Sequence, residues 1–476
     1  MIAKLRPSRK LGCAAALAAA ASACAPTPRL QVAPEVLSTE WRARPSSLAA
    51  APQFATPRNL GQALGSAQLE GLIGRALAAN ADLAIAAARI GQARAQLRLA
   101  RAEMLPVVSA SAGLAGSRAG GGGVKPFDFN EGYAGLDVAF EIDLFGRLKA
   151  GKRSARSRYA AAALDREALA LAVEGEVARA FVQHSALSKR LGLLDRNIGQ
   201  ARELLRIIEV RRRLGEATRV DTGLQTIQLR QLEVERERLL EARSRTANAL
   251  AVLAGEEAPL FAMPEADLDE LQVPALAPAQ PGDLLVRRPD IRAAEARIAA
   301  AEGDIDQARA AFLPRLRLSA GGVAESATLG GPLGSVITAG LGLLAPIFDR
   351  ARLRSGLDMA SAVQVESVES YRKTLLTALG EAENALEAVE RSGARDSLLE
   401  TIVAEAVATA RLARLQYVEG AADLQWVLDA EQRLVQAEDS RAVARQERLE
   451  AAIDLYRALG GAPAGPEPRL ASGPER

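Results

Sequence analysis

The amino-acid sequence contains two copies of one pattern, and this internal repeat constrains the fold more than any other feature. The segment that starts at Asp82 matches the segment that starts at Asp290, which lies 208 positions later (290 − 82). Farther along, the offset becomes 205, as shown by the pairs Gly215 with Gly420 and Gly255 with Gly460. The change falls in the glycine-rich stretch after Gly113, where an insertion into a loop costs little. Both copies are therefore predicted to fold as the same unit.

Each copy reads as a helix, a strand, a loop, a second strand, a very long helix, a glycine turn and another long helix. Six prolines separate the copies and predict a linker without a long helix. The predicted segments are a first repeat over 61–255 with a β-hairpin at 105–145, a linker over 256–289, a second repeat over 290–461 with a β-hairpin at 313–348, and a flexible tail over 462–476.

The segment from Arg147 to Arg213 holds no proline and would span roughly 100 Å as one helix. Its apolar side chains recur at alternating steps of three and four, which is the seam of a coiled coil rather than the stripe of a short globular helix. The seam consists of Val177, Ala180, His184, Leu187, Leu191, Leu194, Ile198, Ala201, Leu205 and Ile208. In the second copy the seam continues through Leu399, Val403, Ala406, Ala410 and Ala413.

Period-two alternation is clearest between Tyr133 and Phe145 and is typical of a membrane-spanning strand. The row predicted to face lipid is Leu136, Val138, Phe140 and Ile142. Asp137 and Glu141 alternate with it and would face water. In the second copy, Leu341, Leu343, Ala345 and Ile347 repeat the apolar row. The stretches expected to be hairpin loops are Gly120 to Gly123 with Lys125-Pro126, and Gly330-Gly331-Pro332.

Four strands cannot seal a membrane pore, because the smallest membrane barrels have about eight. Open sheet edges are not tolerated in lipid, so a chain with these strands in a bilayer must associate with further copies. The alternative is a half-buried soluble sheet, as in a soluble periplasmic coiled-coil lipoprotein or adaptor.

The N-terminus is typical of an export signal over 1–23, with basic residues followed by an apolar run too short to span a membrane. Small residues precede Cys24, in a pattern that resembles the lipobox of bacterial lipoproteins. In such proteins that cysteine carries an S-diacylglycerol and an N-palmitoyl group, and Ala25 after it favours sorting to the outer membrane. Residues 24–60 would then be an extended, lipid-anchored N-terminal arm.

The composition argues against several classes of protein. The net charge is +2, which gives no support for nucleic-acid binding. The chain holds one histidine, His184, and no phosphate-binding loop, metal-ligand spacing or nucleophile elbow, so neither an enzyme nor a cofactor is expected.

Five motifs together resemble the TolC family of outer-membrane efflux proteins, in its lipoprotein (NodT-type) branch. They are Glu141-Ile142-Asp143-Leu144-Phe145-Gly146-Arg147, Arg287-Arg288-Pro289-Asp290-Ile291, Pro346-Ile347-Phe348-Asp349, Val427-Leu428-Asp429-Ala430-Glu431 and Leu455-Tyr456-Arg457-Ala458-Leu459-Gly460-Gly461.

This resemblance implies a mainly α-helical fold with membrane β-strands that closes as a homotrimer. Three copies of four strands would form a twelve-stranded β-barrel, and the helices a twelve-helix periplasmic α-barrel. The duct would pass cargo without catalysis from an inner-membrane pump and a periplasmic adaptor across the outer membrane of a Gram-negative bacterium. Drugs, metals and proteins all remain open as cargo.

The resemblance also implies a constriction at the periplasmic tip. Asp429 matches a tip-ring aspartate of the family, and Asp221 matches the corresponding acid of the first copy. Trp426 stands where some members have a second acid, so it is a candidate plug. The alternative for Asp429 is a solvated carboxylate that flanks the coiled-coil seam.

Overall fold

The structure is a computed structural model that describes residues 40–43, 59–121, 124–274, 280–326 and 332–461. All of these residues belong to one unit, Ser38–Arg476. The signal segment 1–23, Cys24 and the tail 462–476 lie outside the described residues.

The first repeat begins with three helices, of which α4 leads into the strands. The long helices follow the strands and are joined by a turn at Gly215. The elements are α2 (Leu60–Ala63), α3 (Ala67–Ala79), α4 (Ala81–Ala102), β1 (Val107–Gly121), β2 (Val124–Ile142), α5 (Arg147–Leu214) and α6 (Arg219–Leu253).

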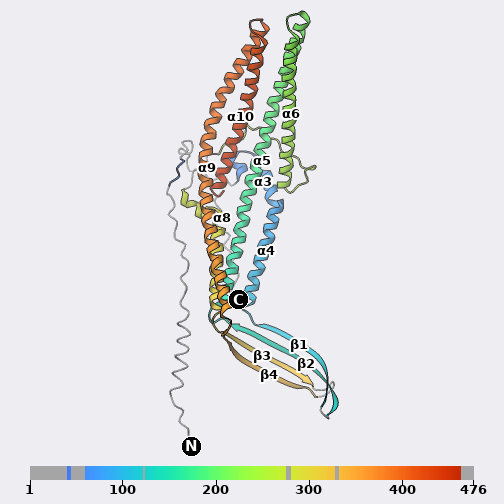
Figure 1. Cartoon of the computed structure of the whole chain (residues 1–476), viewed down its shortest axis with the longest axis vertical. Helices are drawn as coiled ribbons and strands as arrows, with labels where there is room; N and C mark the ends of the chain where they lie inside the picture. Colours follow the sequence, from blue (N-terminus) through green and yellow to red (C-terminus); the bar gives the residue numbers. More distant parts are fainter. Residues whose placement is uncertain (1–39, 44–58, 122–123, 275–279, 327–331, 462–476) are drawn as a thin grey trace. The chain divides into compact units, whose positions relative to one another are not determined.

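The second repeat has the same order, as the sequence predicts (Figure 1). Its elements are the 3₁₀ helix η1 (Pro281–Asp283), α7 (Leu284–Arg287), α8 (Pro289–Ala310), β3 (Arg315–Ser326), β4 (Gly334–Leu344), α9 (Arg350–Val418) and α10 (Leu424–Ala458). No single helix among the described residues has the length and apolar character to cross a membrane, although α3 and α4, bent by 42°, meet that test as a pair.

The repeat also holds at the level of the backbone. Gly215 and Gly420 end α5 and α9 with φ angles of +80° and +75°, and Gly255 and Gly460 follow α6 and α10 with +69° and +88°. Glycine is suited to these positions because a Cβ disfavours the left-handed conformation.

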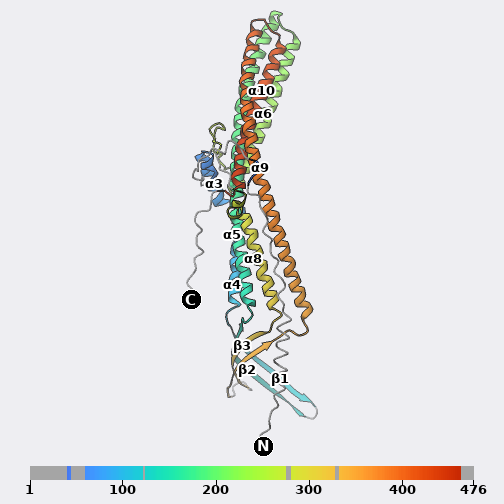
Figure 2. The same cartoon turned by 90° about the vertical axis from the view of Figure 1, so that its left-hand side faces the viewer.

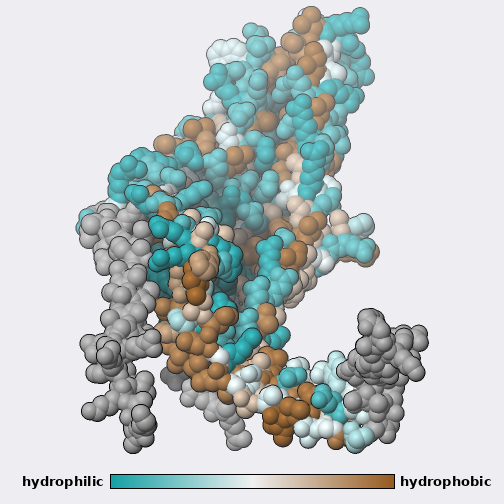
Figure 3. Space-filling model, turned by 60° about the horizontal axis from the view of Figure 1, so that its bottom comes forward, coloured by the Kyte–Doolittle hydropathy of each residue, from teal (hydrophilic) through white to brown (hydrophobic). Residues whose placement is uncertain are grey.

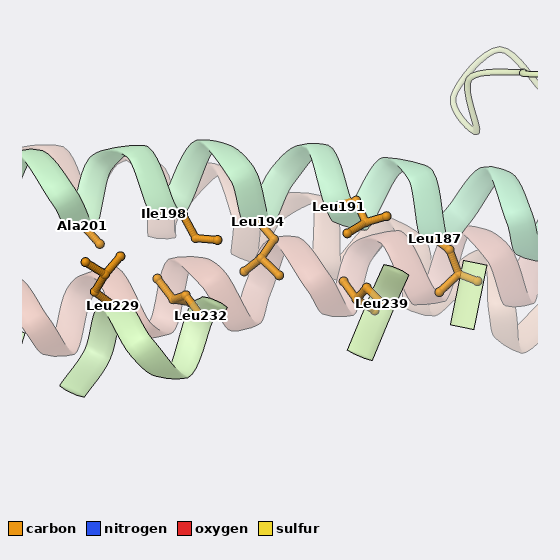
Figure 4. Close-up of a cluster of buried hydrophobic side chains, with 8 residues drawn as sticks. All are labelled: Leu187, Leu191, Leu194, Ile198, Ala201, Leu229, Leu232 and Leu239. Atoms are coloured by element: carbon orange, nitrogen blue, oxygen red, sulfur yellow. The ribbon is translucent and has the colours of Figure 1, made fainter. Parts of the chain in front are cut away.

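The predicted coiled-coil seam of α5 is confirmed, whereas on α9 Ala410 and Ala413 are buried and Leu399, Val403 and Ala406 are only partly buried. Leu191 and Ile198 of α5 are buried, and they lie opposite Leu239 and Leu232 of α6 (Figure 4). Burial of these side chains stabilises the pairing of two helices that are otherwise rich in charge, because each one removes apolar surface from water.

The four strands form one antiparallel sheet in the order β1-β2-β3-β4, located where the helices end (Figures 1 and 2). Its register aligns the predicted apolar rows, since directly paired residues project from the same face of a sheet. Leu136 pairs with Ala110 on β1 and Gly322 on β3, and Phe140 pairs with Leu318, which pairs with Leu341 on β4.

Two details of the predicted hairpins are wrong. β4 ends at Leu344, so Ala345 and Ile347 do not extend the apolar row of the strand; Pro346 between them has no N–H to donate to a ladder. Lys125 and Pro126 lie within β2 rather than in a loop, next to a register irregularity between Ala119 and Gly121, where a strand tolerates proline.

Candidate functional site

The two glycine turns form one end of the long helical hairpins (Figure 1). In the first turn, Gly215 N–H donates to the carbonyl of Arg212 and Glu216 N–H to that of Arg211. In the second, Ala421 N–H donates to the carbonyl of Gln416 over 2.8 Å. These N–H groups donate to carbonyls that have no partner within the helix, so the bonds cap the helix ends and stabilise both turns.

Asp221 is located in the first turn of α6, where it takes part in a capping box. Its carboxylate accepts the Thr218 N–H at 2.7 Å, while its own N–H donates to the Thr218 hydroxyl. This pairing stabilises the start of the helix. The structure therefore assigns the Asp221 carboxylate a capping contact that the sequence analysis did not anticipate.

Trp426 and Asp429 lie three residues apart in α10, so they share one face of the helix. Trp426 is 69% exposed. The Asp429 carboxylate is also exposed and accepts a hydrogen bond from Arg433 Nε at 2.9 Å. Asp429 and Asp221 lie at the same end of the hairpins. They bond to different residues, Arg433 and Thr218, and share no hydrogen-bond partner in the part of the chain that the structure describes.

Between Trp426 and Asp429, the helix turns its other face inward. Val427 is fully buried with Ile208 of α5 and Tyr417 of α9 in one apolar cluster. Residues from α5, α9 and α10 contribute to this cluster, so the two hairpins pack on each other near their turns. The apolar cluster consists of Leu204, Ile208, Ala410, Ala413, Tyr417, Leu424, Val427 and Ala430.

Two arginines that the sequence analysis did not single out join the hairpins. The Arg211 guanidinium lies 4.5 Å from the centre of the Tyr417 ring and donates to the Val418 carbonyl at 2.9 Å. Arg414 donates to Glu431 at 2.5 Å and to Gln200 at 2.9 Å. A signal was present in the internal repeat: at offset 205 Tyr417 corresponds to Arg212, so the two copies differ in chemistry here.

Glu431 is nearly fully buried beside Arg414. Burial raises the pKa of its carboxyl, and the neighbouring Arg414 opposes that shift. The ion pair links α9 to α10 directly beneath the turn.

At the other end of the helices, two acids organise the exit from β2. Glu141 receives both hydrogen bonds of Arg147, at 3.0 and 3.1 Å, and Asp143 accepts the N–H groups of Leu148 and Lys149. Gly146 precedes α5 and has no side chain to cap it, so Asp143 supplies the missing acceptor.

Leu136 is 59% exposed, whereas Val138, Phe140 and Ile142 are partly exposed in the single chain. Figure 3 shows exposed hydrophobic residues over the part of the molecule where the sheet lies. Register and exposure are both consistent with an apolar face that another environment must cover.

The described residues contain no group of three or more histidines, cysteines or acids that could hold a metal ion. His184 is buried in the α5 seam, and this burial lowers its pKa, as does the nearby charge of Arg243. A neutral, packed imidazole fits the structural role that the sequence suggests.

Comparison with known proteins decides the family. The family model described as outer membrane efflux protein matches residues 72–256 and 281–461. The chain belongs to the outer membrane efflux protein family. It is 33% identical over 457 residues to the pyoverdine export outer membrane protein OpmQ of Pseudomonas aeruginosa, covering 92% of this chain and 94% of OpmQ. It is 32% identical to the outer membrane protein OprJ of the same species, covering 83% and 84%.

Solved structures agree with this assignment. The outer-membrane channel OprN superposes with a TM-score of 0.82 at 27% identity, covering 91% of this chain and 98% of OprN. The outer membrane protein VceC of Vibrio cholerae gives 0.77 at 26% identity, covering 85% and 99%. The predicted TolC-like fold, family and outer-membrane location are confirmed. This member of the outer membrane efflux protein family is an efflux channel, and the alternative of a soluble adaptor is not supported.

Proposed function

We propose that three copies of this chain form the exit duct of a tripartite efflux system. The observation that carries the proposal is the four-stranded sheet, whose aligned apolar face ends at two outer strands. Among the described residues β1 pairs with β2 alone and β4 with β3 alone. Because such edges are not stable in lipid, β1 of one copy would pair with β4 of the next.

Exposed apolar side chains on the long helices support the same assembly. On α6, Val220, Leu224 and Ile227 follow steps of four and three and are exposed in the single chain. On α9, Leu398 and Ile402 are also exposed and four residues apart. Unfilled stripes of this spacing are expected where neighbouring helices complete a coiled coil.

The partners of the duct follow from the family. Relatives are named as outer membrane proteins of efflux pumps, among them the toluene efflux pump protein TtgF of Pseudomonas putida. By this likeness, an inner-membrane pump and a periplasmic adaptor would deliver cargo to the helical end of the duct. The duct itself would catalyse no reaction.

Asp429, Trp426 and Asp221 would narrow the tip in the trimer, because they lie at the turns and the first two are exposed on one face of α10. The row Leu136, Val138, Phe140 and Ile142 would face lipid.

Cys24 would carry the diacylglycerol and palmitoyl groups after removal of residues 1–23, with residues 24–60 as the arm. Cys24→Ser should abolish fatty-acid labelling of the mature chain. Fatty-acid labelling that persists in this variant would refute a lipid anchor at Cys24. The segments 61–255 and 290–461, joined by 256–289, would then be the two repeats of the mature protomer.

A cross-linking experiment tests the trimer. β1 and β4 of one chain are three strand spacings apart, about 14 Å, whereas a disulfide requires Cα atoms within about 7 Å. Cysteines introduced at Ala110 and, in turn, at Ala339 or Leu341 should therefore cross-link only between chains and give bands up to a trimer. The control pair Ala110→Cys with Leu136→Cys should close within one chain. Monomers alone, or a ladder beyond three, would refute the proposal.

A further inference from the structure

The starts of the two longest helices carry positive charge in positions where it is intrinsically unfavourable. Residues 144–164 hold six arginines and lysines and no acid, and α9 begins with three arginines in five residues. Neither α5 nor α9 has an acidic residue in its first turn. The amino end of a helix favours negative charge, so bases at both starts oppose the helix dipole. Local conflicts of this kind are expected where function demands them.

Part of this charge is neutralised inside the protein. Arg153 pairs with Asp306 of α8 at 2.7 Å, Arg158 pairs with Asp304, and Arg147 pairs with Glu141. These contacts fasten α5 to α8 and to the end of β2. Asp143 and Asp349, the other acids at the strand ends, are occupied by the start of α5 and by Arg352.

Five bases remain without an ion-pair partner among the described residues. Lys149, Lys152 and Arg156 follow steps of three and four and so share one face of α5, and Arg350 and Arg354 are four residues apart on α9. All are exposed except Lys152, which is partly exposed. We name these five residues the basic collar.

The collar has a defined place relative to the sheet. The chain leaves β2 for α5 and β4 for α9 at the same end of the sheet. The last residues of these two strands, Ile142 and Leu344, pair with the neighbouring residues Leu316 and Arg315 of β3. Between the strands and the collar lie exposed apolar residues, including Phe145 and Phe348, the latter 99% exposed. The order is thus apolar strand, exposed aromatic ring, then bases, which is the order of a lipid boundary.

The geometry points to a binding surface for anionic phospholipid headgroups at the basic collar, on the periplasmic side of the outer membrane. It rests on the proposed function in one respect, namely that the sheet spans the membrane. Phosphate groups at the level of the phenylalanines would lie beside the collar, and the amino ends of α5 and α9 would add their positive dipoles. The surface would fix how deeply the sheet sits in the bilayer.

The test uses the full-length protein in nonionic detergent, titrated with phosphatidylglycerol or phosphatidylcholine, with bound lipid counted by native mass spectrometry. The variant is Lys149→Gln/Lys152→Gln/Arg156→Gln. The matched control removes three bases at the other end of the α5–α6 hairpin, Arg212→Gln/Arg213→Gln/Arg219→Gln. Each base near an anionic surface contributes about fivefold, so the affinity of the variant for phosphatidylglycerol should fall at least tenfold. Phosphatidylcholine binding and the control should stay unchanged.

Equal affinity of the glutamine variant and the wild type for phosphatidylglycerol would refute lipid binding at the basic collar. A changed ion selectivity of the channel at unchanged lipid affinity would also overturn it, and would assign the bases to the lumen. If the glutamine variant does not assemble, two other measurements test the same proposal. Lys149→Arg/Lys152→Arg should retain the preference for phosphatidylglycerol, and the preference of the wild type should weaken as ionic strength rises from about 0.05 to about 0.5 M. Loss of the preference in the arginine variant, or a wild-type preference that does not change with salt, would also refute lipid binding at the basic collar.

A separate readout keeps the two proposals apart. Wild-type protein that forms no channel in neutral bilayers would count against the membrane-spanning sheet itself. Wild-type protein that conducts there but shows no preference for phosphatidylglycerol would remove the basic collar alone.

Discussion

Ile208→Ala should loosen the contact between the two helical hairpins near their turns. Ile208 is fully buried among residues of α5, α9 and α10, so the substitution removes about three methylene-sized groups from a packed site. At about 0.8 kcal/mol per group, the transfer loss is about 2.4 kcal/mol. The cavity that remains extends the range of the loss to about 2–5 kcal/mol.

Hydrogen exchange measured by mass spectrometry can localise this effect. Amides near residues 204–217 and 413–430 should exchange at least about 30-fold faster, because about 1.4 kcal/mol corresponds to a factor of ten and the loss is at least about 2 kcal/mol. Amides of the same helices near the sheet should keep their rates. Ile85→Ala removes the same groups from a half-exposed position on α4 and should leave the tip unchanged. Unchanged amide exchange rates at the tip of Ile208→Ala, or faster exchange along the whole of α5, would refute a local role of this cluster in joining the hairpins.

Three further outcomes are expected. Glu174 is buried and accepts the Leu60 N–H at 2.6 Å; burial raises its pKa, so the folded state holds the proton more tightly than the unfolded state and stability falls as pH rises through that pKa. Glu174→Gln, which keeps the acceptor, should flatten this slope in denaturation curves recorded from acid to neutral pH; an unchanged slope would contradict it. Leu136→Arg should destabilise membrane assembly by about 2–4 kcal/mol near the bilayer midplane, whereas Asp137→Asn on the opposite face should not; equal trimer yields would count against a lipid-facing row. Asp429→Ala should raise single-channel conductance or antibiotic leakage if this carboxylate narrows the tip, and wild-type values in both assays would exclude that role.

Much of the architecture was predictable from local pattern. Alternation identified the apolar row around Leu136, and the seam around Leu194 identified the coiled coil, because side-chain periods of two and 3.5 are direct consequences of backbone geometry. The spacing of Gly215 and Gly420 located both turns. These features depend on residues close together in the chain.

Other features could not be read from such patterns. The motif predicted Asp221 as an acid of the tip constriction, but it did not show that this carboxylate bonds to Thr218, at a helix start that leaves N–H groups in need of an acceptor. β4 ends before Ile347, although the apolar pattern continues past Pro346. At Pro346 a local backbone requirement, the missing N–H, outweighed the alternation on which the prediction relied. The capping contact of Asp221 was not visible in its motif, and its role at the tip stays a prediction.

The regular spacing of neighbouring residues is enough to predict the repeat, the helical seam and the two-faced strands. Three features became visible only in the folded chain. Arg211 packs on Tyr417, Glu174 accepts the N–H of Leu60, and three bases at the start of α5 have no ion-pair partner among the described residues. Arg211 and Tyr417 are 206 positions apart in the sequence (417 − 211). The partners in such contacts depend on how whole helices pack against one another, and periodicity carries no information about a side chain on a different helix.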